Sequence, residues 1–266
     1  MKFKEMFEGF ESTPLLWNDD LVYGLKQFLP KRTLLSAIPK GDYKRLRLGK
    51  WVEAFVSLQL RQQSLINIIY ENLQIKNDKV TIGELDLLFT KDLQPIHLEI
   101  VYKFYLYDSA QTNTTKLEHW IGPNRNDTLI QKLNKLKEKQ LPLLYNKHTI
   151  KAINETEFNV ATAEQYVCFK AQLFIPYKTK DLDIAPLNKA CISGFHMPFK
   201  DIMRLSTYQI YIPSKLNWLN IPTQDVSWLN YDDAFKEIES FINTKKSPLI
   251  WVRLNTKIQK LFITWW

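Results

Sequence analysis

The stretches TIGELDLLFT (Thr81–Thr90) and PIHLEIVYKFYLY (Pro95–Tyr107) decide the fold. Both are rich in β-branched and aromatic residues, and the polar break between them is typical of a β-hairpin with a loop of several residues. Side chains alternate between the two faces of a strand, so Asp86 and Glu99 converge at mid-sheet if the polar faces of the two strands coincide. We therefore expect a pair of strands that brings two carboxylates together.

The surroundings of Asp86 and Glu99 indicate that both carboxylates are partly buried. Their neighbours in the sequence are apolar: Leu85, Leu87, Leu88, Leu98 and Ile100. Adjacent buried carboxylates are unfavourable unless a proton or a cation compensates their charge. Hard oxygen ligands suit Mg²⁺ or Mn²⁺, so the pattern predicts a divalent metal site.

A third carboxylate, Glu53, lies in an apolar-periodic segment from Arg45 to about Asn72 that is typical of a helix facing the core. A charge among such neighbours needs a partner, and the predicted metal site is the nearest candidate. Glu53 therefore joins Asp86 and Glu99 as an expected metal ligand. Lys103, on the same strand face as Glu99, would orient or deprotonate a metal-bound water. This set predicts metal-assisted phosphodiester hydrolysis.

The rest of the chain predicts further helices and strands. Helices are expected at 18–28, 127–145 and 232–243, and strands at 166–175, 208–212, 249–254 and 260–265. The segment Pro176–Pro198, with its prolines, glycine and mixed charge, is interpreted as a linker or a long loop. We divide the chain into a helical extension (1–44), a core (45–175) and a C-terminal α/β part (176–266).

Composition limits the classes of protein. The chain has 266 residues, enough for one large domain or two ordinary ones, and a net charge of +8. A basic balance favours anionic partners such as nucleic acid. The N-terminus MKFKEMFEGF lacks a continuous apolar region, and no window has 18 to 20 uncharged apolar residues. We therefore expect a cytoplasmic protein without a membrane partner, and its two cysteines are not expected to form a disulfide.

Lysines cluster on the predicted helix 127–145. Lys132, Lys135 and Lys139 are spaced i, i+3 and i+7, which places them on one face of an α-helix. Such a stripe either contacts phosphate groups or is the solvated face of an amphipathic helix. Both interpretations stay open at this point.

The order of these residues resembles the PD-(D/E)xK nuclease superfamily. More closely, it resembles a bacterial family of unknown function numbered 1853, over about Arg45 to Leu141. The segments that carry this likeness are RLGKWVEA, GELDLL, HLEIVYKFYL, WIGPNRNDTLIQKL and KQL. The resemblance implies an α/β (α+β) fold with a restriction-endonuclease-like αβββαβ core, whose mixed sheet is flanked by helices, plus additional C-terminal strands.

The resemblance also assigns roles. Glu53 matches the acidic position of the first helix, Asp86 the metal-binding aspartate, and Glu99 the (D/E) of the signature. The signature lysine is expected two residues after Glu99, where this chain has Val101; Lys103 follows two residues later on the same strand face. If Lys103 cannot reach the site, Lys132 is the substitute.

Two functions follow as hypotheses. The first is a Mg²⁺- or Mn²⁺-dependent nuclease that acts on nucleic acid, with DNA favoured. The second is a catalytically inactive protein of the same fold that binds nucleic acid or a protein. The sequence leaves open DNA against RNA, endonuclease against exonuclease cleavage, and the oligomeric state.

Overall fold

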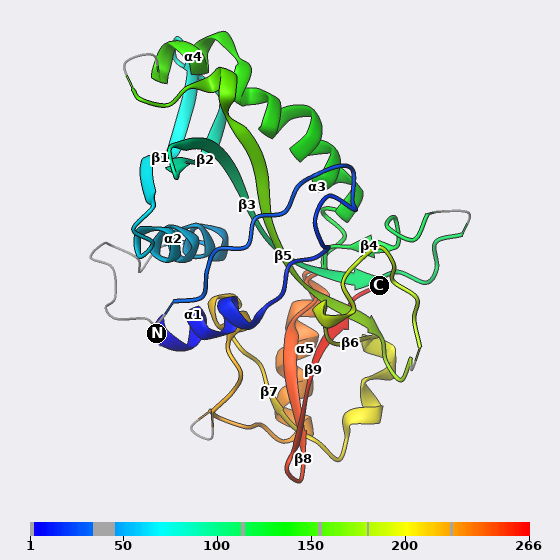
Figure 1. Cartoon of the computed structure of the whole chain (residues 1–266). Helices are drawn as coiled ribbons and strands as arrows, with labels where there is room; N and C mark the ends of the chain where they lie inside the picture. Colours follow the sequence, from blue (N-terminus) through cyan, green and yellow to red (C-terminus); the bar gives the residue numbers. More distant parts are fainter. Residues whose placement is uncertain (1–2, 34–45, 113–114, 154–155, 180, 224–225) are drawn as a thin grey trace. The chain divides into compact units, whose positions relative to one another are not determined.

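The computed structural model of the chain describes residues 3–33, 46–112, 115–153, 156–179, 181–223 and 226–266. It has a mixed α/β fold in which a large mixed sheet is flanked by helices (Figure 1). The residues form two compact units, each assembled from separate stretches of the chain. The hairpin unit comprises Leu15–Tyr102 and Gln131–Lys170, and the terminal unit comprises Met1–Pro14, Lys103–Ile130 and Ala171–Trp266.

The hairpin unit is built around three consecutive antiparallel strands. Its strands are β1 (Ile66–Asn77), β2 (Val80–Lys91), the first part of β3 (Gln94–Tyr107) and the first part of β5 (Glu164–Pro176). β2 pairs with β1 on one side and with β3 on the other, and β5 follows β3 in the sheet. The predicted hairpin is therefore confirmed, with β1 as an additional neighbour.

Helices of the hairpin unit pack on these strands. They are α2 (Leu48–Arg61), most of α3 (Leu129–Lys135), the π-helical turn η2 (Leu136–Gln140), the 3₁₀ turns η3 (Leu141–Tyr145) and η4 (Val160–Thr162), and α4 (Lys147–Ile153). α2 and α4 contact β1, and η2 and η3 contact β2. A Cβ on Gly83 would lie 2.5 Å from a methyl carbon of Leu143, so the glycine of GELDLL lets η3 approach β2 closely.

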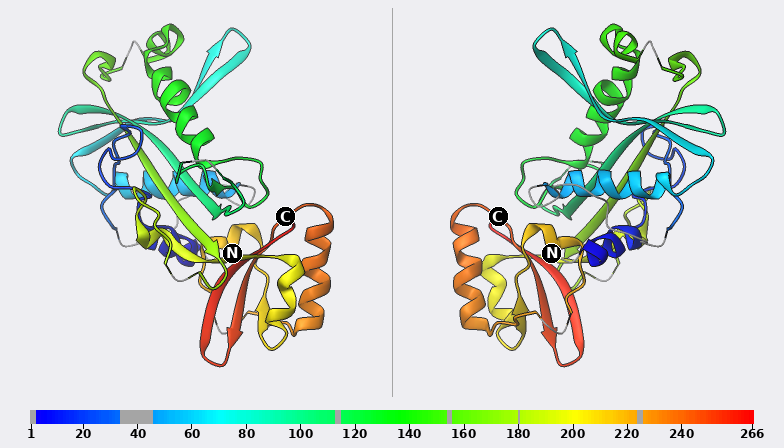
Figure 2. Two further views of the ribbon diagram at one scale, coloured as in Figure 1. Left: turned by 90° about the vertical axis from the view of Figure 1, so that its right-hand side faces the viewer. Right: turned by 90° about the vertical axis from the view of Figure 1, so that its left-hand side faces the viewer.

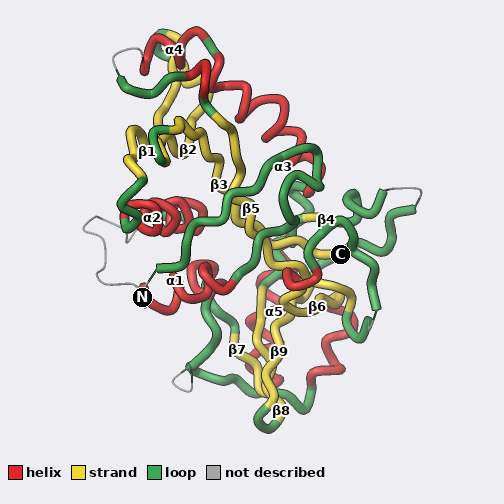
Figure 3. Tube along the Cα trace, in the orientation of Figure 1, coloured by secondary structure: helices red, strands yellow, loops and turns green. Residues whose placement is uncertain are grey.

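The predicted helix 127–145 is present from Leu129 to Tyr145 as one continuous helical segment whose hydrogen-bonding pattern changes along its length. It begins as α3, passes through η2 and ends as η3 (Figure 3). A π-turn takes in an extra residue, so the α-helical spacing that places Lys132, Lys135 and Lys139 on one face is interrupted between Lys135 and Lys139.

The terminal unit contains the remaining strands and helices. They are α1 (Phe3–Ser12), β4 (Trp120–Ile121), η5 (Lys189–Cys191), β6 (Ile192–Pro198), η6 (Phe199–Leu205), β7 (Gln209–Tyr211), η7 (Lys215–Leu219), α5 (Tyr231–Asn243), β8 (Leu249–Leu254) and β9 (Lys257–Thr264). β6 lies parallel to β5 and to β9, while β8 runs antiparallel to β9 and β7 (Figure 2). Its apolar core includes Ile210, Ala234, Ile238, Val252 and Leu261.

One predicted helix, 18–28, is wrong, and the predicted helix over Arg45–Asn72 is wrong in part. Residues 18–28 form turns, because Asp19, Tyr23 and Gly24 adopt positive φ angles that a right-handed helix excludes. The apolar segment from Arg45 to Asn72 begins outside the described residues and contains α2 followed by β1. The polar run after Arg61 ends the helix, and the β-branched residues that follow favour a strand.

The prediction of a linker or long loop over Pro176–Pro198 is also wrong in part, since this segment contains η5 and the parallel strand β6. The two units also differ from the predicted division of the chain at residues 45 and 176, because each unit combines distant stretches of the chain.

Both cysteines, Cys168 and Cys191, are buried and free. Among the described residues, no helix combines the length and apolar character needed to span a membrane.

Lys260 on β9 is a buried base whose titration sets a pH dependence of stability. Its Nζ donates to Gln172 Oε1 at 2.6 Å and to the carbonyl oxygen of Trp218 at 2.7 Å, and it lies 5.3 Å from the ring centre of Trp251. Burial lowers the pKa of Lys260 to about 7. Hydrogen bonding and the aromatic ring therefore only partly replace the solvation that the ammonium group loses.

We expect the variant Lys260→Met to lose part of this pH dependence. The unfolded lysine keeps a pKa near 10.5, so the unfolded state binds more protons between about pH 7 and 10.5. Wild-type stability should therefore rise with pH in this window, by up to about 1.4 kcal/mol per pH unit from this group. Urea unfolding of both proteins at pH 7, 8 and 9 measures the difference; parallel curves would contradict the burial of a titrating Lys260.

Candidate metal and phosphodiester site

Helix α2 presents Lys50 and Glu53 on one face, because residues three apart are neighbours on a helix. The opposite, apolar face carries Trp51, Val52 and Phe55 into the core. Lys50 Nζ donates to Glu53 Oε2 at 2.7 Å. The side chain of Glu53 is 16% exposed, so this carboxylate lies at the edge of the core rather than on the solvated surface.

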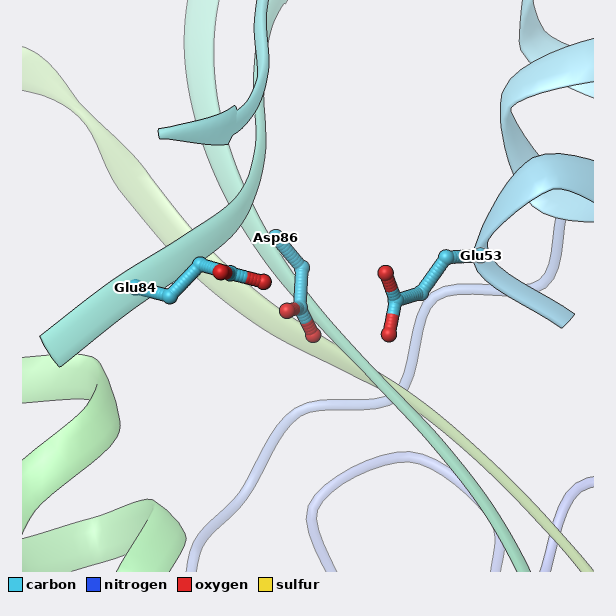
Figure 4. A group of neighbouring side chains, drawn as sticks. All are labelled: Glu53, Glu84 and Asp86. Atoms are coloured by element: carbon cyan, nitrogen blue, oxygen red, sulfur yellow. The ribbon is translucent and has the colours of Figure 1, made fainter. Parts of the chain in front are cut away.

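Strand β2 brings Glu84 and Asp86 to the same place, since residues two apart share a strand face. Figure 4 shows the carboxylates of Glu53 and Glu84 on either side of the carboxylate of Asp86. One oxygen from each of these three groups lies within 4.8 Å of the other two. We call Glu53, Glu84 and Asp86 the carboxylate cluster.

Asp86 and Glu99 influence each other across the β2–β3 pair. The strand register pairs Leu87 with Leu98, and the backbone N–H of Ile100 donates to Asp86 Oδ2 at 2.8 Å. Burial, and next the charge of Glu99, raises the pKa of Asp86 to about 7. The predicted convergence of Asp86 and Glu99 is therefore present in the structure.

Burial is also the largest cause of the pKa shifts of Glu53 and Glu99. It raises the pKa of Glu53 to about 7, helped by the charge of Asp86 and opposed by Lys50. It raises the pKa of Glu99 to about 7, although the charge of Lys132 lowers it. The pKa values of these three carboxyl groups are all raised to about 7, so additional positive charge at this place would be stabilising.

Glu99 lies beside the carboxylate cluster and is held by two side chains. His97 Nε2 is 3.1 Å from Glu99 Oε1, and Gln140 donates to Glu99 Oε2. Burial lowers the pKa of His97 to about 4, so its ring is neutral at neutral pH. Lys132 Nζ donates to Gln140 Oε1 at 2.7 Å, which links the lysine to Glu99 through the amide.

Lys50 is the cation in direct contact with the carboxylate cluster. Besides Glu53, its ammonium group donates to Glu84 and to Asn72 Oδ1, the latter at 2.8 Å. Asn72 has a φ of 53°, a left-handed conformation that asparagine adopts more readily than most residues. Burial lowers the pKa of Lys50, but its bonds to Glu53 and Glu84 outweigh this effect and the pKa is raised.

A pocket of about 430 Å³ opens beside the cluster within the hairpin unit. Lys50, Glu53 and Asp86 form part of its lining, and Arg61 and Glu71 also line it. Arg61 and Glu71 form an ion pair at 3.1 Å. The pocket therefore joins acidic and basic groups in a space large enough for a small group such as a phosphate with its attached sugar.

The predicted site residues differ in where the structure places them. Glu53 and Asp86 meet, with Glu99 adjacent, but Lys103 belongs to the terminal unit and pairs with Asp127 Oδ2 at 2.7 Å. The lysine whose ammonium group bonds to the carboxylate cluster is Lys50. Of the predicted lysine stripe, Lys132 engages Gln140, while Lys135 and Lys139 are exposed.

Sequence reasoning left out Lys50 and Glu84 as site residues, although both carried a signal. Glu84 precedes Asp86 by two positions on the same strand face, and Lys50 precedes Glu53 by three positions on the same helix face. Applying these spacings to each predicted acid would have found them.

An oxygen-only donor set fits a hard divalent cation. Mg²⁺ is bound at about 2.1 Å by carboxylates and water, and Glu53, Glu84 and Asp86 are the residues that could hold such an ion here.

Comparison with curated proteins and with solved structures gives no match. The sequence profile of the family described as Domain of unknown function (DUF1853) matches residues 26–262, and the chain therefore belongs to this family.

Proposed function

We propose that this protein hydrolyses phosphodiester bonds of nucleic acid, with DNA favoured, in a reaction that depends on Mg²⁺ or Mn²⁺. The observation that carries the proposal is the meeting of Glu53, Glu84 and Asp86, from a helix and a strand, beside the buried Glu99. Carboxylates gathered in this way are typical of sites that hold divalent cations.

The order of elements supports the same proposal. In the described residues, α2, β1, β2, β3, α3 and β5 follow one another, interrupted by the short elements β4, η2, η3, α4 and η4. This is the αβββαβ order that the resemblance to PD-(D/E)xK nucleases implies. Glu53 lies on its first helix, Asp86 on its second strand and Glu99 on its third. We therefore assign this protein a restriction-endonuclease-like core as part of the proposal.

The residues of the site have separable roles in the proposed reaction. Asp86, Glu53 and Glu84 would hold the cation, which would polarise the phosphodiester and lower the pKa of a bound water. Lys50 would turn its ammonium group from the carboxylates toward the phosphate and offset the charge that develops there. His97 and Gln140 fix Glu99 next to Asp86.

The test is an assay of cleavage by metal-free protein on fluorescently labelled single- and double-stranded DNA and RNA. Mg²⁺, Mn²⁺ or EDTA is added to separate samples. The proposal predicts cleavage that requires the ion and is strongest on DNA. Absence of cleavage on all four substrates with both ions would contradict hydrolysis.

The second candidate is a catalytically inactive protein of the same fold that binds nucleic acid or a protein. The observation that favours it is Lys50, whose ammonium group bonds to Glu53, Glu84 and Asn72 and already compensates the cluster. An internal cation can replace a metal ion in such a cluster. This protein would bind its partner equally well in Mg²⁺ and in EDTA.

Nucleic-acid binding makes a separate prediction for the exposed lysines of the helical segment. The double variant Lys135→Glu/Lys139→Glu should bind DNA more weakly, because each lysine lost removes a phosphate contact and its released counterion. The slope of log affinity against log salt should fall by about two. Fluorescence anisotropy at several salt concentrations measures it. An unchanged slope, matching that of the control Lys79→Glu at an exposed hairpin turn, would contradict the contact.

A further inference from the structure

The terminal unit has a pocket of its own, with a volume of about 820 Å³. The loop after β3, the ends of β6 and β9, and η6 form its walls. Asp108 anchors the first wall: it is 3% exposed, and its carboxylate accepts from Arg125 at 2.6 Å and from the backbone N–H of Ala110 at 3.0 Å. These bonds hold the guanidinium of Arg125 at the pocket, although its side chain is 40% exposed.

Aromatic rings dominate the apolar part of the pocket's lining. Tyr177, Phe199, Trp265 and Trp266 all line the pocket. The guanidinium of Arg125 lies over the ring of Trp266, 4.6 Å from its centre, and Trp266 Nε1 donates to the carbonyl oxygen of Pro123 at 3.1 Å. Flat aromatic walls of this kind suit a ligand with a planar ring.

Cations lie around the same space. Arg125, Lys200 and Arg204 line it, against the carboxylates of Asp108 and Asp201. Asp108 is bound to Arg125, and Asp201 lies 3.8 Å from Arg204. Lys200 is exposed and forms no ion pair in the described part of the chain. Among the lining side chains, three are cationic and two are anionic, so one positive charge is left over, which favours an anionic group on a ligand.

Two buried ring nitrogens of lining residues lack hydrogen-bond partners among the described residues. They are Nδ1 of His196 and Nε1 of Trp265. His196 Nε2 lies 2.9 Å from the carbonyl oxygen of Tyr107 and must donate to it, so Nδ1 is left as an acceptor. Nε1 of Trp265 is a donor. Buried polar atoms normally have hydrogen-bond partners, so these two nitrogen atoms indicate that the pocket can bind polar as well as apolar groups of a ligand.

We propose that this pocket binds a small ligand that combines a planar heteroaromatic ring with a phosphate or carboxylate group, the chemistry of a nucleoside monophosphate. The ring lies among the aromatic side chains, and the anionic group lies toward Lys200 and Arg204 on η6. The volume is within the range of pockets that enclose ligands of this size. The site is distinct from the carboxylate cluster, whose residues all belong to the hairpin unit.

The experiment is a titration of the full chain with AMP, adenosine or inorganic phosphate in EDTA, followed by tryptophan fluorescence and by calorimetry. EDTA removes any metal-dependent binding at the carboxylate cluster. AMP is expected to bind with a micromolar Kd, and adenosine and phosphate each at least about tenfold more weakly, because each lacks one of the two recognised groups.

Variants locate the binding. Lys200→Glu/Arg204→Glu should weaken AMP binding at least about tenfold, while the control Lys236→Glu/Lys257→Glu, with the same change of charge at exposed positions away from the pocket, should leave it unchanged. No binding of AMP at millimolar concentration would overturn the proposal. So would equal binding of adenosine and AMP, or equal effects of the two double variants.

Discussion

Replacing Asp86 by asparagine is expected to reduce metal-dependent cleavage by roughly a thousandfold, the scale on which a group that stabilises the transition state by electrostatics acts. Asp86 lies between Glu53 and Glu84, and its charge interacts with that of Glu99, so it is the central carboxylate of the cluster. Asparagine keeps the side-chain shape and can still accept from the N–H of Ile100. The loss would therefore be a loss of charge, and initial cleavage rates in Mg²⁺ measure it.

The matched control is Asp78→Asn in the turn between β1 and β2. Asp78 is exposed and has a φ of 54°, a conformation that asparagine also tolerates. This variant should cleave at the wild-type rate. If Asp86→Asn retained full activity while its circular dichroism matched the wild type, the carboxylate cluster would not be the active site.

Replacing Lys50 by methionine should lower kcat by about a hundredfold without weakening metal binding. The variant loses the ammonium group that would offset charge on the phosphate, which reduces the rate. It also leaves Glu53 and Glu84 without their present cation, so Mg²⁺ or Mn²⁺ should bind at least as tightly as in the wild type. Rate measurements at saturating metal, with metal affinity from calorimetry, separate the two effects.

A purely structural lysine would behave differently. Its removal would lower stability and metal affinity together, and Lys50→Arg would restore both. Lys79→Met, at the exposed turn after Asp78, is the control for loss of a lysine near the hairpin. Unchanged kcat in Lys50→Met would exclude Lys50 from the reaction.

The hairpin and its two carboxylates could be predicted because they depend on local alternation alone. Asp86 and Glu99 occupy strands with clear period-two patterns, and the strands pair in sequence order. Glu53 could be predicted because a charge on an apolar helix needs a partner. The inference about the hairpin uses only neighbours along the chain and one short turn, and the inference about Glu53 starts from the apolar residues beside it in the helix.

The lysine of the site could not be predicted in the same way. Both Lys50 and Lys103 lie on a face that points toward a predicted acid, and only the packing of α2 against the strands selects Lys50. The pairing of Lys103 with Asp127 is likewise a contact between residues 24 positions apart. Sequence spacing does not fix which of two lysines reaches a carboxylate through tertiary contacts.

Strand β6 was not predicted, because the segment contains Gly194, a residue that the fold requires at this position. Gly194 suggests a loop, but a Cβ at this position would lie 2.1 Å from the carbonyl oxygen of Lys260 on β9. The glycine therefore permits two parallel strands to approach closely, a role that sequence alone does not distinguish from a turn. The boundary between α2 and β1 was missed for a related reason, since both halves of that segment are apolar.

The most direct test of the central claim is a calorimetric titration of metal-free protein with Mn²⁺ and Mg²⁺, performed on wild type, Asp86→Asn and Lys50→Met. The account predicts binding to wild type, loss of binding in Asp86→Asn, and equal or tighter binding in Lys50→Met. Absence of binding in both wild type and Lys50→Met would show that the carboxylates do not form a metal site, and would contradict the account.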